Sequence, residues 1–348
     1  MKKFSSLHYC RLDGKRFDFL KLVLAIFIVG IHTTPMDFFL QPILRVAVPI
    51  FFIMTSYFFF LNQSKLTYSE EKRFAMKRFV KRYLVLYAFW FVVLLPITII
   101  VRRWNVDFGF DTMLGILKGF MFGSTFPASW FLMASLINVV FVWCVSKKIS
   151  NFLLLILGVL FYIPCCLFSN YYNIIDNQFV TEIYLKYVWM FGEPYNSFPV
   201  ALFFVVLGKI FAENSVFLSN GKISILLLLS FVSLYVEFFT IQHYHLLHCD
   251  DCYLSLIPLS IFLFMLIGQN HIKIDVPTKE IRKCSTIIYC CHLSIVYVVK
   301  KMLTIVDNSF VPKSLLLFII TLLVSLLICL ILYNLTKKDC FRILKWAS

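Results

Sequence analysis

Charged residues are scarce in this sequence. Only 15% of its 348 residues are charged and 61% are hydrophobic, and the mean hydropathy is +0.86. Soluble globular domains carry about 25% charged residues. The composition therefore excludes an ordinary soluble domain and predicts a polytopic membrane protein.

Long polar segments and visible internal repeats are also missing. The longest extramembrane segment that we expect, about 170–196, is short and rich in Tyr and Asn. The N-terminal tail has no small-residue cleavage site, so we expect the first apolar run to be a retained signal anchor. Together these absences predict one integral membrane domain over residues 1–348.

Apolar runs long enough to cross a bilayer as helices occur throughout the chain. The sequence predicts an all-α polytopic membrane helix bundle of about ten transmembrane helices. The expected spans are 17–35, 43–61, 80–101, 126–145, 151–169, 197–212, 222–242, 253–270, 285–303 and 314–335.

The formal net charge of +15 would suggest a nucleic-acid partner in a soluble protein, but here the distribution of Lys and Arg decides its meaning. If the N-terminus is cytoplasmic, most of the Lys and Arg residues fall on segments that lie on the cytoplasmic side of the membrane. We therefore expect both termini to be cytoplasmic, with lipid contacts and no nucleic acid. The sequence leaves a homo-oligomer open.

Two ionisable residues, Lys21 and His32, share the first apolar run. Eleven residues at about 100° each bring both side chains to one helix face, roughly 16 Å apart along the axis. Ionisable groups inside a span usually face a protein interior or a cavity. A structural alternative exists for each: Lys21 can reach the interface, and His32 can be satisfied by a backbone carbonyl.

The second run, RVAVPIFFIMTSYFFF, begins with Arg45 and carries hydroxyls at Thr55, Ser56 and Tyr57. Small polar residues also let helices pack closely, so packing is as good an interpretation of Ser56 as a site role.

A basic residue eleven positions before a histidine, followed by a VPxFFxxSGY-like span, resembles the acyltransferase-3 family of membrane acyltransferases. The segments SWFLMASLINVV at 129–140 and STIIYCCHLSIV at 285–296 resemble further family spans. YNSFPVALFFVVLG at 195–208 and YLSLIPLSIFLF at 253–264 are similar to the membrane domain of vancomycin-resistance serine racemases. Two departures are Lys21, where arginine is usual, and Ser56, where glycine is usual.

The resemblance implies transfer of an acyl group, typically acetyl from acetyl-CoA, to a hydroxyl of a cell-surface or lipid-linked glycan. It implies that His32 acts as general base and that Lys21 supports the donor side. There are two alternatives. One is a serine-type amino-acid transporter, in which Glu237, Lys21 and His32 would serve the passage of substrate or protons. The other is an inactive scaffold.

The cytoplasmic loop KRFAMKRFVKRY at 72–83 is the strongest basic cluster. Arg78, Lys81 and Arg82 are candidates for holding the phosphates of coenzyme A. Positive residues beside a span also anchor it on the cytoplasmic side, and both interpretations can hold together.

Other candidate substrate-binding residues are polar or aromatic groups in later spans: Trp130, Asn196, Glu237, Tyr289 and His292. Tyr289 and His292 share a helix face, as a packed pair or as part of the site. Trp130 has an interfacial-anchor alternative. Because an unpaired carboxylate inside a span is costly, Glu237 is expected to pair with Arg45, Lys21 or His292.

The segment HYHLLHCDDC at 243–252 gathers histidines, cysteines and aspartates in one extracytoplasmic loop. Its spacing does not match a standard zinc finger, so a Cys249–Cys252 disulfide or free thiols are favoured and no metal site is expected.

Overall fold

A computed structural model describes residues 14–35, 38–102, 109–175, 177–214, 218–269, 278–306 and 314–336. The secondary structure in these ranges is helical. The helices are α1 (Gly14–Thr33), α2 (Gln41–Leu44), α3 (Ala47–Ser64), α4 (Ser69–Arg102), α5 (Phe110–Phe122), α6 (Trp130–Val145), α7 (Asn151–Ser169), η1 (Tyr172–Ile174), α8 (Gln178–Phe191), η2 (Pro194–Asn196), α9 (Phe198–Glu213), α10 (Asn220–His243), α11 (Leu256–Gln269), α12 (Thr278–Val306) and α13 (Leu315–Thr336).

Every one of the ten expected spans overlaps a helix, but the number of helices able to cross a membrane is not confirmed at ten. Among the described residues, six helical segments are long and apolar enough, or seven if the bent pair 178–196 and 198–213 forms one span. Helices α6 and α11 are short, and α1 carries Lys15, Arg16, Asp18 and Lys21 in its first half. The helices therefore support a multi-pass membrane protein but not a count of ten spans. Both terminal tails lie outside the described residues.

Polar residues begin several of the apolar helices. At the starts of α7, α8 and α10, the side chains of Ser150, Asn177 and Ser219 each accept a hydrogen bond. The donor in each case is the backbone N–H of the residue three positions later. Each cap satisfies a donor that has no partner within the helix. The caps therefore help to fix where these three helices begin.

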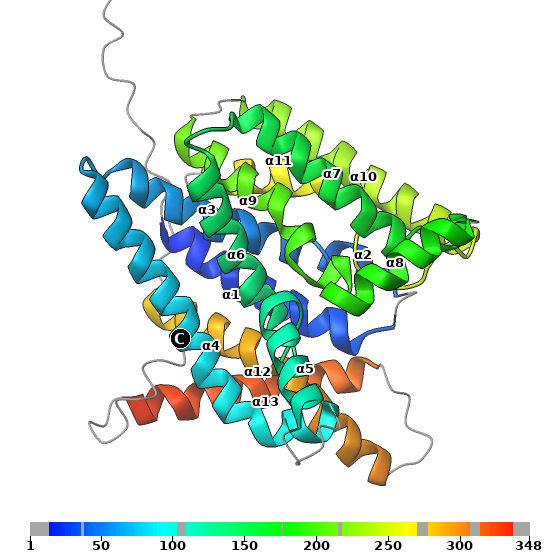
Figure 1. The fold of residues 1–348 in the computed structure, drawn as a ribbon. Helices are drawn as coiled ribbons and strands as arrows, with labels where there is room; N and C mark the ends of the chain where they lie inside the picture. Colours follow the sequence, from blue (N-terminus) through cyan, green and yellow to red (C-terminus); the bar gives the residue numbers. More distant parts are fainter. Residues whose placement is uncertain are drawn as a thin grey trace, which may run out of the picture.

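Helices α1, α3 and α9 form the centre of the bundle. In Figure 1, α7 and α10 lie along one edge and α12 and α13 along the opposite edge, with α1 and α3 between them. Pairing of α3 with α9, of α1 with α12 and of α7 with α9 makes the most extensive helix contacts. The central helices therefore bring segments from both halves of the sequence together.

The α3–α9 contact depends on Gly208 and Ser56. A Cβ on Gly208 would overlap the carbonyl oxygen of Ile53 and lie 2.8 Å from the Cβ of Ser56. The hydroxyl of Ser56 donates a 2.5 Å hydrogen bond to the carbonyl of Val205. Small residues thus allow a close backbone approach, as in other membrane helix pairs.

Candidate functional site

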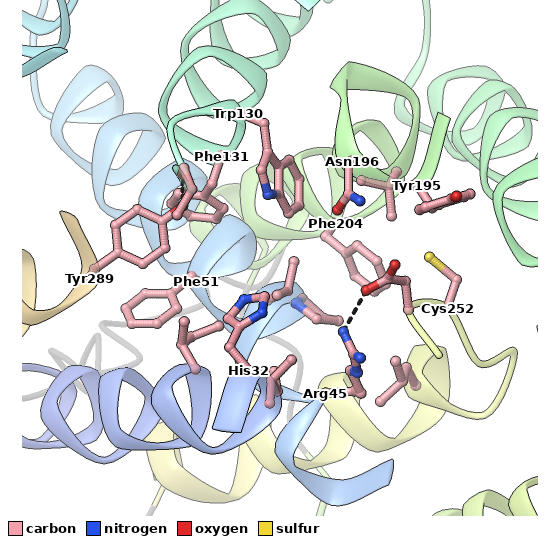
Figure 2. Close-up of a pocket in the computed structure, with 18 of the residues that line it drawn as sticks. His32, Arg45, Phe51, Trp130, Phe131, Tyr195, Asn196, Phe204, Cys252 and Tyr289 are labelled. Atoms are coloured by element: carbon pink, nitrogen blue, oxygen red, sulfur yellow. Dashed lines mark hydrogen bonds and ion pairs between the residues drawn. The ribbon is translucent and has the colours of Figure 1, made fainter. Parts of the chain in front are cut away.

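A small cavity of about 50 Å³ lies at the end of the bundle that holds the C-terminal part of α1. Figure 2 shows His32 and Arg45 on one side of it, with Trp130 and Asn196 reaching in from the opposite side. Its walls come from six parts of the chain: α1, the α2–α3 junction with α3, the 128–131 turn, η2 with α9, the 251–256 segment, and α12. Helix α7 adds Tyr162 and is the seventh part of the chain in the wall. Such convergence of polar groups in an apolar pocket is typical of a binding or active site.

Two histidine rings meet in this cavity. His32 of α1 and His292 of α12 have ring centroids 5.3 Å apart, tilted by 31°. His32 is half-buried, whereas His292 is fully buried. The Nδ1 atom of His292 lies 2.7 Å from the carbonyl oxygen of Tyr289, one turn earlier in α12.

The turn before α6 is strained and is held by α12. Ala128 has a φ of 66°, which is uncommon for a residue with a side chain. The hydroxyl of Tyr289 donates a 2.6 Å hydrogen bond to the carbonyl of Ala128. Beside this turn, the Trp130 ring packs on Phe52 and Phe131. The strained turn therefore sets the direction in which the chain enters α6 and places Trp130 at the cavity.

Arg45 is the buried cation of the cavity. Its Nη1 lies 2.5 Å from Oδ1 of Asp251, and its Nε lies 3.8 Å from Oδ2 of Asp250. The hydroxyl of Tyr253 also donates to Asp250. The Asp250 side chain is fully buried, whereas that of Asp251 is 22% exposed and reaches the cavity wall. Arg45 is thus neutralised by two carboxylates from a loop that follows α10.

Ser169 and Asn170 at the end of α7 hold this loop. The backbone N–H groups of Asp251 and Cys252 donate to the side chains of both residues, at 2.9 to 3.3 Å. The hydroxyl of Ser169 also lies 3.1 Å from the carbonyl of Cys249. Several backbone groups of the loop are therefore satisfied by one fixed site.

Cys249 and Cys252 in this loop are free thiols. The Cys249 thiol lies 3.2 Å from the hydroxyl of Ser169, and burial raises the pKa of Cys249 above its ordinary value. Within the described ranges, no group of three or more His, Cys, Asp or Glu side chains is arranged to hold a metal ion.

Six of the residues predicted from the sequence line the cavity together: His32, Arg45, Trp130, Asn196, Tyr289 and His292. The other seven predicted residues lie elsewhere. Ser56 packs against α9, and Tyr57 is buried against the rings of Phe17 and Phe264. Neither side chain is part of the cavity wall, because their positions on α3 face other helices.

Glu237 also lies outside the cavity, and its expected pairing with Arg45, Lys21 or His292 is wrong. Its carboxylate accepts hydrogen bonds from the backbone N–H groups of Leu254 and Ser255, each at 2.7 Å, and from the hydroxyl of Tyr171 at 2.6 Å. These donors satisfy the carboxylate inside an apolar helix and join α10 to the start of α11.

Lys21 lies at the other end of α1 from His32. Its Nζ is 3.4 Å from Oδ1 of Asp18, and Asp18 also faces Arg282 of α12 at 3.7 Å. The candidates Arg78, Lys81 and Arg82 are exposed on α4, and Lys81 borders a shallow apolar groove that includes Met76 and Val80. Several cationic groups therefore lie at the helix ends opposite to the cavity.

Asp251, Asp250 and Tyr195 are the site residues that sequence reasoning missed. The two aspartates were noted only as metal ligands by type. A usable signal existed, because Arg45 within an apolar run requires an anionic partner. A pair of adjacent aspartates in a loop is a natural candidate for that partner.

The structure defines a membrane-embedded helix bundle with a histidine-containing cavity between its central helices. The chain belongs to the acyltransferase-3 family, since the family model described as "Acyltransferase domain" matches residues 15–334. That model covers nearly the whole chain, including every residue that lines the cavity.

Curated relatives cover most of the chain at low identity. An amino-acid racemase of Enterococcus faecalis is 26% identical over 297 residues, 79% of this chain and 40% of the relative. A second amino-acid racemase from the same species is 25% identical over 343 residues, which are 92% of this chain and 46% of the relative. A serine/alanine racemase of Enterococcus gallinarum is 24% identical over 280 residues, which are 75% of this chain and 38% of the relative. The chain spans less than half the length of these relatives. No solved structure matches it significantly.

Proposed function

We propose that the protein is a membrane O-acyltransferase that moves an acyl group, typically acetyl, from cytoplasmic acyl-CoA to a hydroxyl of a cell-surface or lipid-linked glycan. The observation that carries this proposal is the meeting of His32 with the Arg45–Asp251 pair and Trp130 in one cavity. A neutral imidazole can take the proton of a hydroxyl. The paired charges and the indole offer hydrogen bonds and an apolar face to a polyol.

The arrangement of basic residues supports the direction of transfer. If the excess of Lys and Arg lies inside, the end of α1 with Asp18 and Lys21 is cytoplasmic and the cavity opens towards the outside. The cations Arg78, Lys81 and Arg82 then lie on the cytoplasmic side, where they can contact the phosphates of acyl-CoA. We propose on this basis that the protein is oriented with its cavity outward, and that its membrane is the bacterial inner membrane.

In this reaction His32 acts as general base. The acceptor oxygen attacks the thioester carbonyl, a new C–O bond forms and the C–S bond breaks. The hydroxyl proton passes to His32 and then to the coenzyme A thiolate, so the histidine returns to its neutral form. Because the cavity is small, the acceptor enters only after side chains in its wall move.

Mass spectrometry of surface polysaccharide from cells with and without the gene tests the proposal. The expected result is a mass increase of one acyl unit that depends on the gene. Purified protein in liposomes with labelled acetyl-CoA and the extracted glycan gives the direct assay. Absence of label transfer in the liposomes together with unchanged glycan mass would contradict the proposal.

An amino-acid transporter is the second candidate. Arg45 beside Asp250 and Asp251 offers one cation and two carboxylates, which could bind the two charged groups of an amino acid, and racemase names occur among the relatives. Serine uptake by protein-containing liposomes without acyl-CoA would favour this function. Acyl transfer without serine uptake would favour the enzyme.

A further inference from the structure

The Nε2 atom of His292 is a buried polar atom that makes no hydrogen bond to any residue the structure describes. His292 is fully buried and is part of the cavity wall. Most buried polar groups in proteins have a hydrogen-bond partner, so an exception inside a candidate active site needs a specific explanation.

The other ring nitrogen determines what Nε2 can do. Nδ1 lies 2.7 Å from the carbonyl oxygen of Tyr289, and a carbonyl oxygen can only accept a hydrogen bond. The proton of the neutral imidazole is therefore on Nδ1. As a result, Nε2 carries a lone pair and is a hydrogen-bond acceptor.

Helices α1 and α12 contact each other at two positions along their length, and the two histidines meet at one of them. Near their N-terminal ends, Arg282 lies 3.7 Å from Asp18. Further along both helices, the His32 and His292 rings are 5.3 Å apart between centroids. The helices therefore run in the same direction, and the ring of His292 is kept beside the ring of His32.

We propose that His292 is a positioning residue for His32, an inference that rests on the proposed acyl transfer. When the acceptor is bound, the N–H of His32 donates to Nε2 of His292, and the other nitrogen of His32 takes the hydroxyl proton. Catalytic hydrogen bonds are often longer in the free enzyme and shorten in the complex. Through the two rings, the Tyr289 carbonyl fixes the proton position on His292, and His292 fixes it on His32.

The bond changes remain those of the acyl transfer. The acceptor oxygen forms a bond with the thioester carbon, the C–S bond breaks, and the proton moves from the hydroxyl to His32 and then to the thiolate sulfur. His292 neither gains nor loses a proton. Its lone pair stabilises the positive charge that His32 carries between the two transfers.

Nitrogen NMR of ring-labelled histidine in lipid bilayers tests the proton positions without requiring activity. The expected spectrum shows His292 as a single neutral tautomer with the proton on Nδ1. In the presence of an acceptor glycan, His32 also becomes a single tautomer, and His292→Phe abolishes this ordering. A mixture of tautomers at His292, or an unchanged His32 signal in His292→Phe, would overturn the proposal. Both results are independent of whether acyl transfer occurs.

Kinetics of two variants distinguish positioning from proton transfer by His292 itself. His292→Phe removes the acceptor and is expected to lower kcat by about 100-fold with little change in KM. His292→Gln keeps an acceptor oxygen and is expected to stay within about tenfold of the wild-type kcat. Cys291→Ala, a buried change on the same helix, is the control for packing. Equal losses in the Phe and Gln variants would contradict a positioning role.

Discussion

Arg45 and Asp251 are joined by a 2.5 Å ion pair, although 206 residues separate them in the sequence. Arg45 follows the short helix α2, and Asp251 belongs to the loop between α10 and α11. The pair lies at the cavity, with the buried Asp250 as a second carboxylate. Removal of either charge therefore affects both the stability of the bundle and the wall of the site.

Replacement of Arg45 is expected to destabilise the protein more than replacement of Asp251. Arg45→Met leaves two carboxylates without their cation, one of them fully buried, at a cost of about 3 to 5 kcal/mol. Asp251→Asn leaves Asp250 to balance the guanidinium, so its cost is smaller. Thermal unfolding in detergent measures both, with the exposed Lys186→Met as control. Equal destabilisation by the two variants would contradict this ranking.

His32→Ala is expected to lower acyl transfer by about 100-fold or more, because it removes the general base. The amount of protein in the membrane should not change, since the half-buried ring leaves a space open to the cavity. His243→Ala, at an exposed end of α10, is the matched control and should retain activity. Undiminished transfer by His32→Ala would exclude His32 as the base.

Gly208→Ala is expected to destabilise the α3–α9 contact. The new Cβ would overlap backbone of α3, which cannot move aside as a flexible side chain can. The expected loss is about 1 to 3 kcal/mol. Gly115→Ala in α5 provides the control, because its Cβ would meet no atom within 4 Å. Retention of full thermal stability by Gly208→Ala would show that the two helices can separate without cost.

Ala128→Gly is expected to preserve or raise stability, and Ala128→Val to lower it. At a φ of 66°, glycine has no steric penalty, whereas a β-branched side chain is strongly disfavoured. The two effects on thermal unfolding should therefore have opposite signs, or the glycine effect should be near zero. A stabilising valine would contradict the backbone geometry.

Alkylation of Cys249 is expected to be slow at neutral pH. The thiolate is the reactive form, and burial raises the pKa of this thiol, so little thiolate is present until the pH is well above the usual range for cysteine. Maleimide labelling followed by mass spectrometry should show a rate that increases with pH. The exposed Cys144 gives the comparison. Faster labelling of Cys249 than of Cys144 at pH 7 would contradict the expectation.

The lengths of the hydrophobic runs predicted where the long helices lie. They did not predict how many of these helices are long and apolar enough to cross a membrane. Each expected run is helical, whereas α5 and α8 were missed because they are short and mix charged with apolar residues. The spacing of Lys21 and His32 correctly placed both on one helix, yet only His32 reaches the cavity.

The candidate site was predictable where a residue type is costly in an apolar helix, as for Arg45 and His292. It was not predictable for Ser56 and Tyr57, since a motif gives spacing along a helix but not which neighbour each face meets. The role of Asp251 depends on a contact between distant segments, which no local pattern contains.

The close approach of α3 and α9 limits how this protein can change shape. With Gly208 seated against the Ile53 carbonyl and Ser56 bonded to Val205, neither helix can slide along the other without a backbone collision. Any widening of the cavity for an acceptor must therefore come from its other walls, which are α1, α12, α7, the 128–131 turn, η2 and the loop that carries Asp251. The α3–α9 pair acts as the stationary frame against which those elements move.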